Sequence, residues 1–174
     1  MFRNAFFICM LFPPVSMASH YAMAADSCQP VFDAMRKVLV TPSHVFSTEG
    51  AGTRVGAKPR NSESIYFGGA IYFKLNDKWI RSKMTAQQML EQDKENREQG
   101  KATCRYLREE VVGGEAAAVY SAHSDNEDVK SDGQVWISKK GLPPRQELDT
   151  DIGDPGKIHH SIRYEYSNVQ APPM

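Results

Sequence analysis

The chain has 174 residues, enough for one domain with a hydrophobic core of its own. It carries 21 Lys+Arg and 21 Asp+Glu, so no overall charge attracts it to nucleic acid. Hydrophobic residues make up 41% and aromatic residues 10% of the chain, a composition that argues against intrinsic disorder.

The first 24 residues have the three-part layout of a secretory signal peptide. The start MFRN carries one arginine and no acid, and the apolar run that follows is too short to span a bilayer. Ala22 and Ala24 then supply small residues at the −3 and −1 positions of a cleavage site. Cleavage after Ala18 and an uncleaved N-terminal anchor are the alternatives. We expect residues 1–24 to be a signal peptide and residues 25–174 to form a single domain, periplasmic or secreted and not integral to a membrane.

The cysteines support an exported protein. Cys9 leaves with the signal peptide, so Cys28 and Cys104 remain. Two cysteines in an exported chain most simply form one disulfide, the alternative being two free buried thiols.

The first predicted element is a helix that begins near Cys28. Pro30 suits the first helical turn, and the pair Thr41-Pro42 ends the pattern. The apolar residues recur at the spacing of one helical face: Cys28, Val31, Phe32, Met35, Val38 and Leu39.

Strand-like runs follow at residues 44–50, 64–75 and 78–84, and the Gly-rich stretch between the first two indicates a loop or a long hairpin end. Asn76-Asp77 is a hairpin-type turn. Gly68-Gly69, inside the second run, predicts a bulge or a sharp bend.

A second helix is predicted from Thr85, which can cap it together with Gln88, to Gly100. Its apolar face is narrow, consisting mainly of Met89 and Leu90, so its outer side should be solvated.

The rest of the chain predicts strands joined by short turns: residues 101–112, 115–124, 134–140, 144–151 and 157–169. The last run alternates between apolar and polar residues, which is typical of an antiparallel sheet with one packed face. Residues 132–149 are interpreted as a hairpin, with Lys139 and Lys140 at its exposed turn. We therefore expect an α+β fold: a strongly curved antiparallel β-sheet, or half-barrel, with two helices packed on one side.

No residue pattern indicates catalysis. His159 and His160 are neighbours on a strand and point to opposite faces, so they cannot chelate one metal together. The acidic segment 125–132 lacks the spacing of a calcium loop. The chain contains no G-x-S-x-G, phosphate loop or dinucleotide fingerprint. We expect no enzyme activity, no cofactor and no metal.

Three segments of the C-terminal half carry a resemblance to a known family. Trp136-Ile137 ends a strand, Gly141-Leu142-Pro143 followed by Arg145 forms a turn, and Tyr166-Ser167-Asn168-Val169 closes the last strand. In these features the chain resembles the LolA-like half-barrels, the superfamily of outer-membrane lipoprotein-sorting carriers that includes mycobacterial lipid-binding lipoproteins. The resemblance implies a periplasmic half-barrel whose helices form a lid over a hydrophobic cavity, without catalysis.

The leading hypothesis is a periplasmic, non-enzymatic carrier or binding protein for an acyl-chain ligand or lipoprotein. The cavity would be lined by large apolar residues of the strands, each of which could equally be plain core: Phe67, Ile71, Phe73, Trp79, Trp136, Ile162 and Tyr164. A second hypothesis is a secreted interaction or inhibitor module that uses the loops 51–60 and 125–132. A third is a small secreted hydrolase built around His123 or His159.

Overall fold

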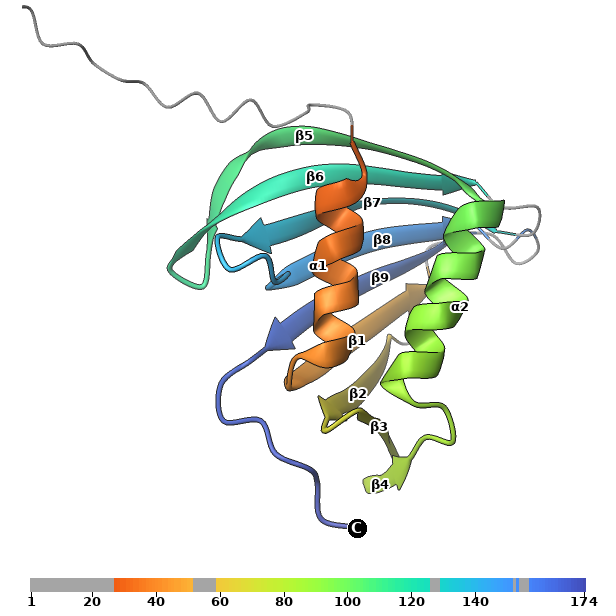
Figure 1. Cartoon of the computed structure of the whole chain (residues 1–174), viewed down its shortest axis with the longest axis vertical. Helices are drawn as coiled ribbons and strands as arrows, with labels where there is room; N and C mark the ends of the chain where they lie inside the picture. Colours follow the sequence, from red (N-terminus) through yellow and green to blue (C-terminus); the bar gives the residue numbers. More distant parts are fainter. Residues whose placement is uncertain (1–26, 52–58, 126–128, 152, 154–156) are drawn as a thin grey trace, which may run out of the picture.

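The computed structural model describes residues 27–51, 59–125, 129–151, 153 and 157–174, and the predicted signal peptide lies outside these residues. Within these residues, two helices and nine strands follow one another (Figure 1). In chain order they are α1 (Gln29–Val40), β1 (Ser43–Ala51), β2 (Arg60–Phe67), β3 (Ala70–Leu75), β4 (Lys78–Arg81), α2 (Ala86–Gln99), β5 (Lys101–Val112), β6 (Glu115–Asp125), β7 (Lys130–Ser138), β8 (Arg145–Asp151) and β9 (Lys157–Glu165).

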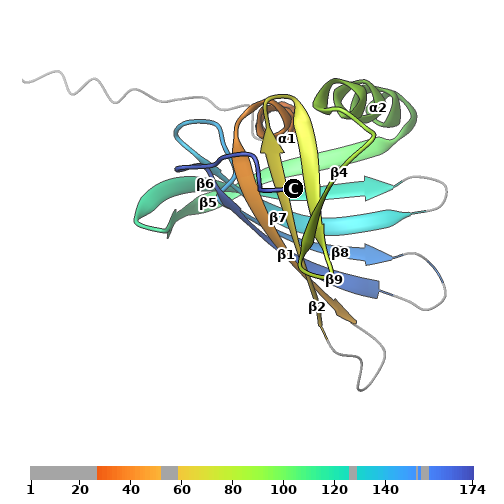
Figure 2. The ribbon, with the colours of Figure 1, turned by 90° about the horizontal axis from the view of Figure 1, so that it is seen from below.

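The strands form one antiparallel sheet in the order β4-β3-β2-β1-β9-β8-β7-β6-β5. Both helices lie on the same side of this curved sheet, which we call the inner face (Figure 2). The sheet is not closed, because β4 and β5 are edge strands and do not pair with each other. The predicted fold class, a curved antiparallel half-barrel with two helices on one side, is confirmed.

Two-residue turns join several neighbouring strands. Asn76 and Asp77 both have positive φ and connect β3 to β4, as the sequence predicts for a hairpin turn. Gly68 and Gly69, with φ of 59° and 75°, also form such a turn. The sequence predicted a bulge or a sharp bend inside one strand-like run. There is no bulge here: the chain reverses at this pair, so the run is divided into β2 and β3.

Gly133 allows β7 and β8 to approach each other closely. A Cβ at this position would lie 2.3 Å from the backbone oxygen of Glu147 and 3.1 Å from the Cα of Leu148. No other residue fits this space without a shift of the backbone, so the glycine permits the close approach of the two strands.

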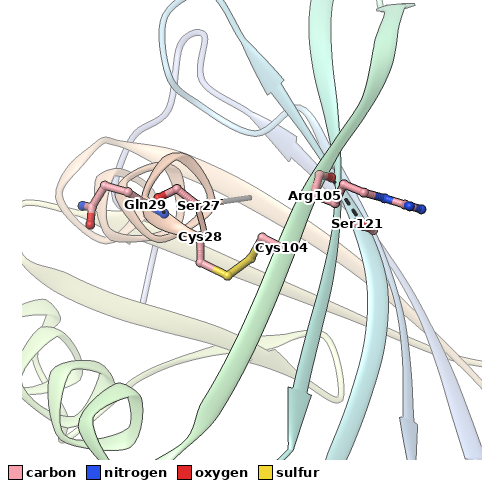
Figure 3. Close-up of a disulfide and its surroundings, with 6 residues drawn as sticks. All are labelled: Ser27, Cys28, Gln29, Cys104, Arg105 and Ser121. Carbon is pink, nitrogen blue, oxygen red and sulfur yellow. Dashed lines mark hydrogen bonds between the residues drawn. A yellow bond between two sulfur atoms is a disulfide. The ribbon is translucent and has the colours of Figure 1, made fainter. Parts of the chain in front are cut away.

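Helix α1 is fastened to the inner face by packing and by a covalent bond. Val31 and Ala34 pack against Tyr120 and Val135 of the sheet, as the helical spacing predicts. The disulfide predicted between Cys28 and Cys104 is present, with a Cα–Cα distance of 4.8 Å, and joins the start of α1 to β5 (Figure 3).

Helix α2 has the predicted cap and the predicted narrow apolar face. The Thr85 side chain accepts a hydrogen bond from the backbone N–H of Gln88, and the Gln88 side chain accepts one from the backbone N–H of Thr85. Of the helix residues whose side chains are described, only Ala86 is buried, while Met89 and Leu90 are half-buried. Packing therefore holds α2 more weakly than α1.

The segment after β9 packs against the sheet. Pro172 is buried, and residues 167–173 line a hollow of about 430 Å³ together with His44, Ile65 and Trp79. The terminal segment therefore covers the outer face of β1 and its neighbours, which the proline-rich sequence alone does not indicate.

Candidate functional site

An apolar cavity lies between the two helices and the inner face of the sheet. Its volume is about 290 Å³, close to the lower end of small-molecule pockets at ~300 Å³. Helices and strands contribute to its wall: Met35, Val38 and Leu39 from α1, Met89 and Asp93 from α2, and Val45, Ser47, Tyr66, Ile162 and Tyr164 from the sheet. Eight of these ten side chains are aliphatic or aromatic, which suits a hydrocarbon ligand.

Burial affects two tyrosines of the cavity wall. Burial raises the pKa of Tyr66 and of Tyr164 above their ordinary range, because the charged phenolate is poorly solvated there. The Tyr164 hydroxyl donates a hydrogen bond of 3.0 Å to Gln146, so its polar end is satisfied. The ring itself packs with Val38 and Val45 as part of the wall.

An ion pair on α2 lies next to the cavity. Asp93, a wall residue, pairs with Arg97 one turn later, with 2.9 Å between Oδ2 and Nη2. The Arg97 guanidinium also lies 5.0 Å from the ring centre of Phe32 on α1. This cation–π contact connects the two helices where few apolar contacts do.

Seven strand residues were predicted from the sequence to line the cavity, and the structure places them in different regions. Ile162 and Tyr164 line the cavity. Ile71 is fully buried on the same face, opposite Tyr66, and Phe73 is on that face but 46% exposed. Phe67 and Trp136 lie on the outer face, and Trp79 lines the hollow beside the terminal segment.

The helical part of the wall was missing from the sequence-based selection. Met35, Val38, Leu39 and Met89 all line the cavity. The helical spacing of the first three was visible in the sequence, but an apolar helix face ordinarily predicts core packing, so it did not mark a cavity.

A second, more open hollow of about 910 Å³ lies on the outer face of β5–β9. His123, Asp132, Asp149 and His159 occupy neighbouring positions on four adjacent strands and line it. His123 Nδ1 lies 2.7 Å from Asp132, and His159 Nδ1 lies 2.8 Å from Asp149. The structure therefore places a carboxylate within hydrogen-bond distance of each imidazole that the hydrolase hypothesis used.

The ion pairs of His159 predict a measurable titration. The hydrogen bond that His159 donates to the Asp149 carboxylate is the largest cause that raises the pKa of His159 above the usual 6.5, and Glu147 adds to it. A proton NMR titration should place the midpoint of His159 above 6.5, and Asp149→Asn should lower it. Because the folded-state pKa is the higher one, this interaction stabilises the fold below about 6.5 and is lost as pH rises through the raised pKa. A midpoint at or below 6.5 in the parent protein would contradict the geometry.

Across the part of the chain that the structure describes, no cluster of three or more His, Cys, Asp or Glu side chains has the arrangement to hold a metal ion. Within the same residues, neither helix combines the length and the apolar character needed to cross a membrane. The predicted interaction loops include residues 52–58 and 126–128, which lie outside the description.

One solved structure with a similar fold is that of LprF from Mycobacterium bovis. It has 11% sequence identity and a TM-score of 0.47, and the match covers 86% of this chain and 98% of that chain. MucB has 12% identity and a TM-score of 0.39, over 82% of this chain and 58% of that chain. A LolA superfamily protein from Nitrosomonas europaea has 7% identity and a TM-score of 0.26, over 80% and 93%.

No protein-family model and no curated protein matches the chain. Because all three TM-scores are below 0.5, these likenesses support no statement about ligand or partner.

Proposed function

We propose that this protein binds a hydrophobic ligand with an acyl chain, free or as part of a lipoprotein, in the cavity between its helices and its sheet, and carries it without catalysis. The apolar cavity of about 290 Å³ is the observation that carries the proposal. Its wall is mostly apolar with two polar side chains, Ser47 and Asp93, which is the composition typical of small-molecule sites.

The two helices are attached to the sheet with different strength, and this difference supports entry of a ligand from the side of α2. Helix α1 is held to the sheet by the disulfide and by buried side chains, whereas α2 has only a narrow half-buried face. Elements with few buried apolar contacts open at a low free-energy cost. Movement of α2 would enlarge the cavity while α1 and the sheet keep their places.

The disulfide also supports action outside the cytoplasm, because such bonds persist in oxidising compartments. Together with the signal peptide predicted for residues 1–24, it favours the periplasm or the exterior as the place of action.

Filling the cavity should abolish binding. Ser47 lies in the wall, opposite Ile162, so Ser47→Phe should place a ring in the space for the ligand. We expect the affinity for a fluorescent palmitate analogue, measured by titration, to fall about ten-fold or more, equivalent to ~1.4 kcal/mol. Circular dichroism and the melting temperature should show that the variant is folded.

Thr48→Phe is the matched control, since Thr48 is the next residue on β1, points to the outer face and is exposed. Its affinity for the palmitate analogue should equal that of the parent. Equal affinity of the two phenylalanine variants, or no binding by the parent, would refute the proposal. Native mass spectrometry of the protein purified after export offers an independent check, because a carrier should retain a lipid.

A further inference from the structure

Four large apolar side chains are exposed together around the β3–β4 hairpin at one edge of the sheet. Phe73 and Leu75 are on β3, Ile80 is on β4 and Met84 follows in the link to α2. Their exposed fractions are 46%, 59%, 49% and 41%. Phe73 and Ile80 are direct cross-strand partners, and Leu75 is two residues from Phe73, so these three point to the same, inner face. We call these four residues the hairpin patch.

The surroundings of the hairpin patch are cationic, although the chain as a whole is neutral. Between residues 73 and 84, one acid, Asp77, stands against four bases: Lys74, Lys78, Arg81 and Lys83. Lys74 lies 2.9 Å from Glu63 on the neighbouring strand. The other three bases, Lys78, Arg81 and Lys83, follow the turn and are exposed. Lys78 is the cross-strand partner of Leu75 and shares its face, whereas Arg81 points to the outer face. The hairpin thus combines exposed hydrocarbon with a local excess of positive charge.

A row of inner-face positions connects the hairpin patch to the cavity. Tyr164 and Val45, both in the cavity wall, are cross-strand partners. The row continues from Val45 through Ser64 to Phe73 and then to Ile80 on the edge strand. Side chains at partnered positions point to the same face, so one face leads from the cavity to the exposed edge.

We propose that the hairpin patch docks the protein on an anionic phospholipid bilayer, with the apolar side chains in the interface and the bases on lipid phosphates. Lys and Arg side chains are attracted to an anionic surface, and exposed apolar groups add to the binding when they leave water. Neither contribution suffices alone, but the hairpin supplies both at one place. In the further step, which rests on the proposed function, the acyl chain would pass along this face between the bilayer and the cavity.

A lipid surface fits these residues better than a protein strand added to the sheet edge. The edge strand β4 has only four residues, which offers a partner strand few backbone hydrogen bonds. Exposed apolar residues mixed with bases are the composition of segments that bind membrane interfaces.

The test is co-sedimentation of the exported protein with vesicles at low ionic strength. We expect binding to vesicles that contain phosphatidylglycerol, much weaker binding to pure phosphatidylcholine, and release by added salt, since exposed charges are screened. The double variant Leu75→Ser/Ile80→Ser should weaken binding to the anionic vesicles about ten-fold or more. Lys78→Glu/Lys83→Glu should weaken it similarly.

Val111→Ser is the matched control, because Val111 is an apolar side chain that is 70% exposed but lies beside Glu109 and Glu110 on β5. It should bind vesicles like the parent. Failure of the parent to bind anionic vesicles, equal binding to both lipids, or unchanged binding by the double variants would overturn the docking proposal. If the parent protein does not bind anionic vesicles, a protein partner at this edge becomes the alternative.

Palmitate-analogue binding separates this proposal from the proposed function. Leu75 and Ile80 lie outside the cavity wall. The double variant Leu75→Ser/Ile80→Ser should therefore bind the palmitate analogue normally in the absence of vesicles. A parent protein that binds vesicles but no analogue would leave the docking surface in place and refute the cavity as a ligand site.

Discussion

Replacing both Cys28 and Cys104 by alanine should lower the free energy of unfolding by about 4–5 kcal/mol. The disulfide closes a loop with a sequence separation of 76 residues, and in the chain-entropy model a crosslink of this length restricts the unfolded chain by that amount. Cys104 is buried and belongs to the core cluster with Val31 and Tyr120. Alanine keeps the site apolar, so most of the loss should come from the missing crosslink.

Urea denaturation, followed by tryptophan fluorescence and by circular dichroism, measures this loss. The parent protein treated with reductant is the control, and its stability should fall to nearly that of the double variant. A double variant with an unchanged denaturation midpoint would show that the crosslink contributes nothing. Since the same bond fastens α1, the double variant should also bind the palmitate analogue more weakly.

Trp136→Ala should cost about 3–5 kcal/mol, the second large effect we expect. Trp136 is 4% exposed and belongs to a core cluster on the outer face with Ala117 and Val119. The guanidinium of Arg145 lies 4.6 Å from the ring centre and covers it. Loss of the indole would therefore leave a cavity and remove the cation–π contact. It would consume much of the usual ~5–15 kcal/mol margin of a domain.

Lys139→Ala and Lys140→Ala provide the comparison, because both residues lie at the exposed turn after β7. The 3.5 Å ion pair of Lys140 with Glu115 is exposed at both ends, so each change should alter stability by about 0.5 kcal/mol or less. Thermal unfolding of the three variants measures the contrast. An unchanged melting temperature for Trp136→Ala, with loss of ligand or partner binding in a lysine variant, would identify this hairpin as a functional loop.

The fold was largely predictable because its signals are local. Alternation of apolar and polar residues in the last strand defines its packed face, and Asn76-Asp77 defines a turn by its backbone preference. Gly68-Gly69 was interpreted wrongly because two glycines permit a bulge and a turn equally well. The pairing of Phe67 with Ala70 shows that the glycines form a turn. This pairing depends on how the two strands align in the sheet, which the local sequence does not determine.

The candidate site was predictable only in part. Alternation identified Ile162 and Tyr164 as inner-face residues, and both line the cavity. It could not show which part of that face the helices cover, so it selected Ile71 and Phe73 as well, which lie on the same face outside the cavity wall. The choice of Trp136 followed from its size, whereas its position in the register places it on the outer face.

The pairing of β1 with β9 has a consequence for how the chain folds. Strands β1–β4 and β5–β9 can each form from neighbouring hairpins, but the two groups meet only where β1 pairs with β9. Helix α1 contacts both groups. Val38 packs on Val45 of β1 and on Tyr164 of β9, and Val31 and Ala34 pack on the β5–β9 group. Contacts between such distant parts of a chain slow folding to the range of about milliseconds to seconds. The cavity wall includes residues of both groups, such as Val45 on β1 and Ile162 on β9. A ligand site should therefore appear only in the last step of folding, once β9 has paired with β1.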